Sequence, residues 1–209
     1  MLRSRFLFIV LFGLTAALST QAQPHAHRSS AGGPQTTPLS SVKGTITIHV
    51  GKSGLFSGFG HNHTVVAPID HGNVDTKDMA VEITVITARM KVTDSDVSEK
   101  DRAEVQSTML GPKVLDAAKF PEIHFKSSRV EQTSPGHFRV LGKLDLHGAS
   151  KELVFEVTGD ASRYRGKTKL KQTDFGIQPV TAAGGAVKVK DELEIEFDVY
   201  PADFHNGKP

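Results

Sequence analysis

The chain of 209 residues contains no cysteine. It therefore has no disulfide bond, no thiolate nucleophile, no iron–sulfur cluster and no zinc site of the Cys type. A domain of this length must be stabilised by its packed core alone. The miniature scaffolds that depend on disulfides are excluded for the same reason.

Long apolar runs are missing after the first 22 residues. At the start, Arg3 and Arg5 precede the apolar run FLFIVLFGL, and the segment ends in TAALSTQA, with small residues around Gln21. This pattern predicts a secretory signal peptide over residues 1–22, cleaved after Ala22, and hence a periplasmic or secreted protein. The run is too short for a membrane anchor, which needs about 20 apolar residues.

An excess of one charge is also missing once the signal peptide is removed. The chain has 25 Lys and Arg residues against 23 Asp and Glu residues. Loss of Arg3 and Arg5 leaves 23 basic residues against 23 acidic ones. Because the basic residues are scattered among the acids, the protein has no field that would attract nucleic acid, and nucleic acid is not expected as a partner.

The segment 23–40, QPHAHRSSAGGPQTTPLS, is poor in bulky apolar residues. It cannot bury enough apolar surface to offset its ordering entropy, so it is predicted to be a flexible leader. One domain is expected over residues 41–203, followed by a C-terminal tail over 204–209. No internal repeat and no second core is evident in the sequence.

Within this domain, apolar and polar residues alternate with a period of two, which is typical of strands with one buried and one solvated face. The regular stretches are TITIHV (45–50), MAVEITV (79–85), EIHFKS (122–127), HFRVLGKLDLHG (137–148), ELVFEV (152–157) and ELEIEFDVY (192–200). With the less regular 63–66 and 163–177, they predict an all-β fold, an antiparallel barrel of about eight strands. Such a barrel either fills its interior with side chains or holds a ligand there, and the period does not decide between the two.

One segment, residues 98–120, departs from this period and reads as a short helical insertion. Ser98 is expected to be the N-cap, with Asp101 three residues later. Gly111 and Pro112 are expected to end the helix, and Pro112 to start a second one.

Motifs of known catalytic sites are missing: the sequence has no H-E-x-x-H, no G-x-S-x-G and no phosphate-binding P-loop. The glycine-rich stretch AAGGAV (182–187) lacks the Lys-Ser/Thr end of a P-loop and is interpreted as a hairpin turn. We therefore expect a protein that is not an enzyme and uses no cofactor.

The stretch FSGFGHNHTVV (56–66) leaves an alternative open. On a strand, His61 and His63 would point to one face and could supply two ligands to zinc, as in a metal-dependent hydrolase. No spacing selects a third ligand, for which four other histidines of the domain are each possible: His49, His71, His124 and His147. The other interpretations of His61 and His63 are solvated strand residues, or neutral hydrogen-bond donors at the polar mouth of a ligand cavity.

Three ordered motifs resemble the YceI-like, polyisoprenoid-binding family. Residues 142–157, GKLDLHGASKELVFEV, are similar to its G-x-L-x-x-x-G-x-[ST]-x-x-V stretch. Residues 120–130, FPEIHFKSSRV, resemble [YF]-P-x-I-x-F-x-S, and 171–177, KQTDFGI, resemble x-x-D-F-G-I. Asp101 and Arg102 stand where the family often has an Arg-Asp pair. The chain departs at 60–72, GHNHTVVAPIDHG, where many members carry H-x-G-x-S-x-V-x-G.

The resemblance implies a lipocalin-like barrel that holds a long isoprenoid, of the quinone or polyprenyl type, in an apolar tunnel. Since each buried CH₂ contributes about 0.8 kcal/mol, such a chain would bind without a charged anchor. The residues expected to face the lipid are Ile48, Val50, Phe56, Phe59, Val81, Ile83, Phe125, Leu144, Leu146, Phe155, Phe175, Ile195 and Phe197. A barrel with a filled core and no ligand stays open as an alternative, as does the oligomeric state, a homodimer included.

Overall fold

The structure is a computed structural model that describes residues 36–38, 44–53, 62–75, 78–160, 162–182 and 187–200. The predicted signal peptide and C-terminal tail lie outside these ranges, as do Phe56, Phe59 and His61. Three residues of the predicted leader, Thr36–Pro38, form a strand. Among the helices described, none is long and apolar enough to cross a bilayer.

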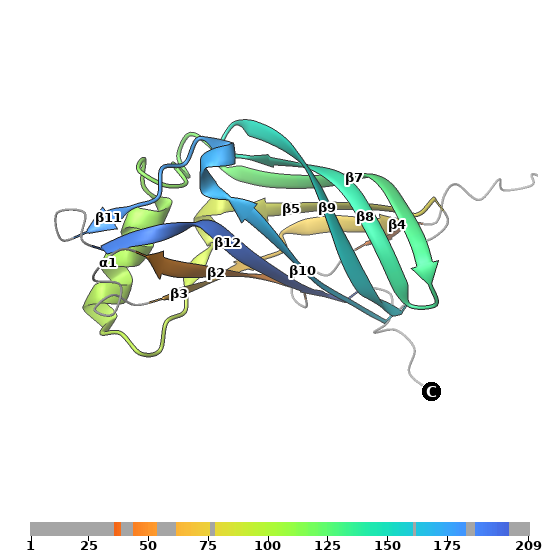
Figure 1. Cartoon of the computed structure of the whole chain (residues 1–209), viewed down its shortest axis with the longest axis horizontal. Helices are drawn as coiled ribbons and strands as arrows, with labels where there is room; N and C mark the ends of the chain where they lie inside the picture. Colours follow the sequence, from red (N-terminus) through yellow and green to blue (C-terminus); the bar gives the residue numbers. More distant parts are fainter. Residues whose placement is uncertain are drawn as a thin grey trace, which may run out of the picture. The chain divides into compact units, whose positions relative to one another are not determined.

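Strands dominate the described residues and form one antiparallel sheet (Figure 1). They are β1 (Thr36–Pro38), β2 (Thr45–Ser53), β3 (His63–Pro68), β4 (His71–Asp75), β5 (Ala80–Ile86), β6 (Lys91–Val92), β7 (Glu122–Ser134), β8 (His137–Leu146), β9 (Ala149–Asp160), β10 (Arg163–Lys171), β11 (Thr181–Ala182) and β12 (Val187–Val199). Their order in the sheet is β1-β4-β5-β7-β8-β9-β10-β12-β2-β3-β6, with β11 paired to β12.

The sheet curls until strands near its two ends meet. Asp70, just after β3, donates its backbone N–H to the carbonyl oxygen of Thr84 on β5 at 2.9 Å. β3 is the last strand but one at one end of the sheet, and β5 is the third strand from the other end. The right-handed twist between neighbouring strands accumulates into this curl, so one face of the sheet lines an interior.

The alternation of apolar and polar residues in the sequence corresponds to an inner and an outer face of the curled sheet. On β12, Ile195 and Phe197 face the interior. The acidic residues that alternate with the apolar ones on this strand face outward, where Lys169 Nζ of β10 lies 2.8 Å from Glu192 Oε1. Lys167 pairs in the same way with Glu194 and Glu196. Exposed pairs of this kind contribute little to stability, but they keep the outer face of the sheet solvated.

The all-β antiparallel fold predicted from the sequence is confirmed, but its number of strands is higher than expected. The eight predicted strands correspond to β2, β3, β5, β7, β8, β9, β10 and β12, and four more are present in the described residues: β1, β4, β6 and β11. Three of these four contain only two or three residues. A period of two cannot be recognised over so short a stretch.

The helical insertion contains one α-helix, α1 (Glu99–Leu110). Its N-cap is Ser98, as predicted: the Ser98 Oγ accepts the N–H of Asp101 at 3.1 Å and donates to the Asp101 carboxylate at 2.8 Å. The helix ends at Gly111.

The second helix predicted from Pro112 onward is wrong, because residues 112–115 form turns. The chain folds back, and the N–H groups of Leu115 and Ala117 bind the carbonyl oxygens of Met109 and Leu110. These hydrogen bonds satisfy carbonyl groups that have no partner within the helix at the C-terminal end of α1. Asp116 then takes a positive φ of 44°, which a continuing helix does not allow.

The packed core fills part of the interior. Ten buried side chains form its main cluster: Val65, Ala67, Val85, Met90, Val92, Met109, Leu115, Leu146, Phe175 and Ile177. They come from β3, β5, β6, β8, α1 and the segments beside them. Ile69 and Val199 form a smaller second cluster.

Between β7 and β12, phenylalanines alternate with glycines on neighbouring strands. Phe125, Phe155 and Phe197 lie on β7, β9 and β12, with ring centroids 5.4 and 5.2 Å apart. Gly142 on β8 and Gly166 on β10 lie between them, and each is covered by a phenylalanine ring. A Cβ at Gly142 would lie 2.4 Å from Phe125 Cζ, so only glycine leaves room for this row.

Replacing Gly142 with alanine is expected to lower the free energy of unfolding by about 1–3 kcal/mol. The new Cβ would lie 2.7 Å from the Lys126 carbonyl oxygen, which belongs to the backbone, so the sheet itself must shift. Urea denaturation measures the loss. Gly51→Ala is the control, because its Cβ would meet only the flexible Lys190 side chain, at 2.9 Å. Equal losses in the two variants would contradict the steric explanation.

Candidate functional site

A cavity of about 780 Å³ lies inside the curled sheet. Inward-facing side chains of nearly every strand line it, and most of them are aliphatic or aromatic. Of the residues predicted to face a ligand, these line the cavity: Ile48, Val50, Val81, Ile83, Phe125, Leu144, Leu146, Phe155, Ile195 and Phe197. The period of two places them on one face of each strand, and the curl brings those faces together.

Phe175 is in the core instead. Its side chain is 1% exposed and belongs to the main buried cluster, and it is not among the residues that line the cavity. The reason is local: Phe175 ends the 3₁₀ turn η3 (Gln172–Phe175) rather than continuing β10. The period of the strand therefore does not set the direction of its side chain.

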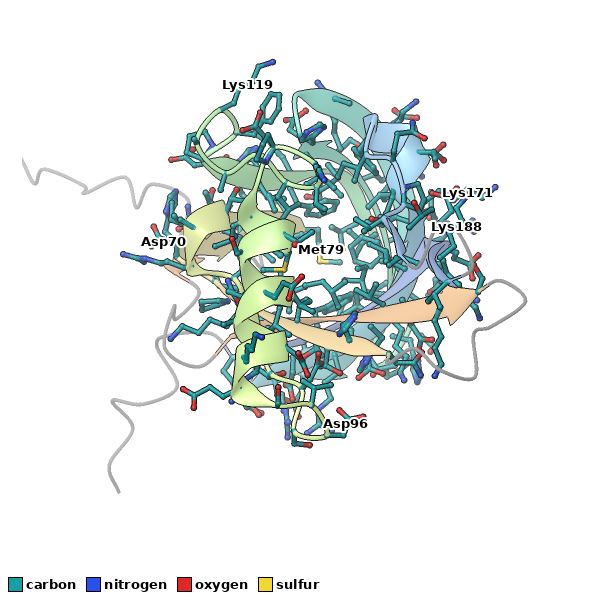
Figure 2. All side chains as sticks on the ribbon, turned by 90° about the vertical axis from the view of Figure 1, so that its left-hand side faces the viewer. Asp70, Met79, Asp96, Lys119, Lys171 and Lys188 are labelled. Carbon is teal, nitrogen blue, oxygen red and sulfur yellow. The ribbon has the colours of Figure 1, made fainter. Side chains whose placement is uncertain are left out.

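The sequence did not indicate that α1 contributes to the cavity. Asp101, Glu104, Val105 and Thr108 line it, and all four lie on one face of the helix because they are three, four and seven residues apart. That spacing could have indicated an inward-facing side of the helix. It was not recognised because most of the residues at this spacing are polar. The helix lies across one end of the curled sheet (Figures 1 and 2).

We call the end of the cavity next to this helix the α1 end. In addition to the helix residues, His63, Lys52 and Lys188 line it. Lys52 and Lys188 lie on the neighbouring strands β2 and β12. Figure 2 looks onto this end, with α1 in front and Lys188 to one side. With Asp101 and Glu104 on the helix, two cationic side chains and two carboxylates line this end, so apart from His63 its formal charges sum to zero.

The opposite end carries Tyr164. Its ring lies 6.0 Å from that of Phe138, and both residues line the cavity. Burial raises the pKa of the Tyr164 phenol above its ordinary value, and the carboxylate of Asp160 acts in the same direction. The phenol therefore stays neutral near neutral pH, and this end of the cavity remains mostly apolar.

Helix α1 is held in place over its end by two polar side chains. Arg102 donates from Nη1 to the carbonyl oxygen of Asp94 at 2.8 Å. The Gln106 side chain accepts the N–H of Val92 at 2.7 Å and donates to the carbonyl oxygen of Met90 at 2.8 Å. These bonds connect the helix to β6 and to the residues on either side of that strand.

His63, at the start of β3, is paired with a buried acid. Its Nδ1 lies 2.6 Å from Oδ2 of Asp94, and the side chain of Asp94 is 2% exposed. The other carboxylate oxygen, Oδ1, accepts the N–H of Thr64 at 2.7 Å. Asp94 lies 31 residues away in an irregular loop, so sequence reasoning missed it.

The other histidines considered as metal ligands are engaged elsewhere. His49 lies near Glu196, His71 near Asp70 and His124 near Glu82, while His147 Nδ1 is 3.1 Å from the carbonyl oxygen of Phe175. Among the described residues, no group of three or more His, Cys, Asp or Glu side chains is placed to hold a metal ion. The structure thus brings none of these histidines to His63.

Comparison with known proteins agrees with this architecture. The profile of the YceI-like domain matches residues 39–200. The chain belongs to the YceI-like family. A UPF0312 protein of Vibrio cholerae serotype O1 is 30% identical over 132 residues, 58% of this chain and 66% of the relative. A UPF0312 protein of Pseudomonas savastanoi pv. phaseolicola is 32% identical over 94 residues, 40% of this chain and 47% of the relative. The chain thus spans just under two thirds of the first relative and about half of the second.

The fold of the YceI-like chain is also seen in a solved structure. The crystal structure of Burkholderia cenocepacia BcnA matches with a TM-score of 0.55 at 17% identity, over 77% of this chain and 98% of that one. At this identity the match supports the fold alone. The residues that line the cavity of the present chain must therefore be judged from its own geometry.

Proposed function

We propose that this YceI-like protein binds a long isoprenoid, of the quinone or polyprenyl type, in the cavity of its curled sheet. The observation that carries the proposal is a cavity of about 780 Å³ lined mainly by apolar side chains. This volume lies within the range of about 300–1,000 Å³ typical of small-molecule sites. The family is a polyisoprenoid-binding one, which supports the same class of ligand.

The energetics suit a long apolar chain. Each CH₂ moved from water into the cavity contributes about 0.8 kcal/mol, so a few isoprene units suffice for tight binding. The row of Phe125, Phe155 and Phe197 offers flat apolar surface along the way. A barrel with a filled core does not agree with this volume, and no observation favours a hydrolase.

We further propose that the protein is exported to the periplasm or secreted, on the basis of residues 1–22. Arg3 and Arg5, the apolar run and the small residues before Ala22 support this. Sequencing the N-terminus of the mature protein tests the proposal, with Gln23 as the expected first residue. A mature chain that still begins at Met1 would contradict it.

Titration of the lipid-free protein with isoprenoids of increasing length tests the binding proposal. We expect the melting temperature to rise with ligand concentration, because a ligand that binds only the folded state stabilises it. The rise should increase with each isoprene unit until the cavity is full. Mass spectrometry of solvent extracts should also find isoprenoid that co-purified with the protein. A melting temperature unaffected by every chain length, together with lipid-free extracts, would disprove the proposal.

A further inference from the structure

We infer that the α1 end of the cavity recognises a neutral head group that carries a hydroxyl, and that this hydroxyl donates its hydrogen bond to Nε2 of His63. The inference rests on the proposed isoprenoid binding and specifies its ligand. An acceptor at this position would make the protein bind isoprenoid alcohols and quinols more tightly than quinones and prenyl phosphates.

The buried carboxylate of Asp94 fixes the tautomer. An ionised carboxylate only accepts hydrogen bonds, so the imidazole nitrogen 2.6 Å from Oδ2 must carry the proton. That nitrogen is Nδ1. In the neutral ring the other nitrogen, Nε2, is then unprotonated and is an acceptor. Of the interpretations that the sequence left open for His63, a neutral donor at the mouth of the cavity therefore does not fit this tautomer, in which Nε2 is an acceptor.

The second nitrogen is available to a ligand. His63 lines the cavity, next to Val50, its partner across the β2–β3 pair. No described residue forms a hydrogen bond with its Nε2. A head group at the α1 end therefore meets an unprotonated nitrogen in a partly buried setting, since the His63 side chain is 21% exposed. In such a setting, a hydroxyl that donates to Nε2 is favoured over a carbonyl oxygen that cannot.

The charged side chains around His63 do not favour an anionic head group. Lys52, Lys188, Asp101 and Glu104 all line the cavity, so two positive and two negative formal charges leave this end without a net positive field. Both carboxylates belong to the inward face of α1 and are themselves acceptors. A phosphate would gain no net attraction from these four charges and would meet the lone pair of Nε2, whereas an alcohol or a quinol brings a hydroxyl donor and no charge.

The decisive variant is Asp94→Asn. The N–H of Thr64 requires an acceptor where Oδ1 now lies, so the amide oxygen of the new side chain takes that place. Its NH₂ group then faces Nδ1 of His63, which must give up its proton and become an acceptor. Nε2 thereby becomes the protonated nitrogen and a donor toward the cavity. The same ring in the same place should prefer carbonyl head groups.

Binding is measured without oxygen for four probes with tails of equal length: a quinol, its quinone, a prenyl alcohol and its phosphate. We expect the unaltered protein to bind the quinol and the alcohol about tenfold more tightly than the quinone and the phosphate. In Asp94→Asn the quinol should lose its advantage and the quinone should gain it. In His63→Phe the protein should no longer discriminate between quinol and quinone.

Two further measurements keep these outcomes distinct. An isoprenoid hydrocarbon without a head group should bind all three forms alike, which shows that they are folded with intact cavities. Nitrogen-15 NMR of the imidazole should show Nε2 unprotonated in the unaltered protein and protonated in Asp94→Asn. Binding of the hydrocarbon with no preference for hydroxyl head groups, or a protonated Nε2 in the neutral ring of the unaltered protein, would overturn this inference alone. Failure of every probe, the hydrocarbon included, would overturn the proposed function itself.

Discussion

Replacing Ile195 with tryptophan is expected to block the cavity and weaken isoprenoid binding about 100-fold. Ile195 lies on β12 between Ile48 of β2 and Thr168 of β10, and all three side chains line the cavity. The indole would occupy space that a lipid tail needs. Excluding about four methylenes costs roughly 3 kcal/mol of binding free energy, which corresponds to a factor of about 100. Titration of the lipid-free variant measures the loss.

The stability of the ligand-free protein should change little in this variant, because the indole enters space that is already empty. Val154→Trp is the matched control: Val154 lies on β9 with 50% of its surface exposed, and it does not line the cavity. The control adds the same side chain to the outside of the sheet and should bind isoprenoid normally. If Ile195→Trp also bound normally, the lipid would not lie in this cavity.

The largest loss of stability is expected from Phe175→Ala, at about 3–5 kcal/mol in the free energy of unfolding. The Phe175 side chain is 1% exposed and packs in the main core cluster, where its removal would leave a void. Because it does not line the cavity, the variant should retain its affinity for isoprenoid wherever it is still folded. Urea denaturation gives the stability, and titration at low temperature gives the affinity.

Phe155→Ala provides the contrast. Phe155 lines the cavity and touches the rings of Phe125 and Phe197, but it is only partly buried. We expect this variant to lose less stability than Phe175→Ala and to bind isoprenoid more weakly. If instead Phe175→Ala lost affinity in the folded state and Phe155→Ala did not, the assignment of the two rings to core and cavity would be reversed.

Much of the fold could be predicted because the signal is periodic. On β12, alternate residues from Leu193 to Val199 are apolar, and the structure turns this whole row inward. The Ser98 cap of α1 was found for a related reason, since both ends of its hydrogen bonds lie within four residues. The short strands β1, β6 and β11 were missed because two or three residues contain no period.

The candidate site was predictable in part. A periodic strand indicates which side chains face inward, and that gave Phe125, Phe155 and Phe197. The position of Phe175 was predicted wrongly because the chain leaves β10 and forms the 3₁₀ turn η3, in which side chains do not alternate with a period of two. The role of Asp94 was not predicted because its loop has no periodic pattern and its partner His63 is distant in the sequence.

The sequence by itself determined the class of fold, the family and the apolar character of the interior, since these depend on residue types at fixed local spacing. Only the tertiary structure decided that the interior is hollow, that α1 lies over one end, and that Asp94 orients His63. The physical reason is that volume and hydrogen-bond direction arise between segments far apart in the chain. Gly142 shows this best: the sequence places it on a strand, but only the ring of Phe125 and the carbonyl oxygen of Lys126, both brought beside it by strand pairing, explain why no side chain fits.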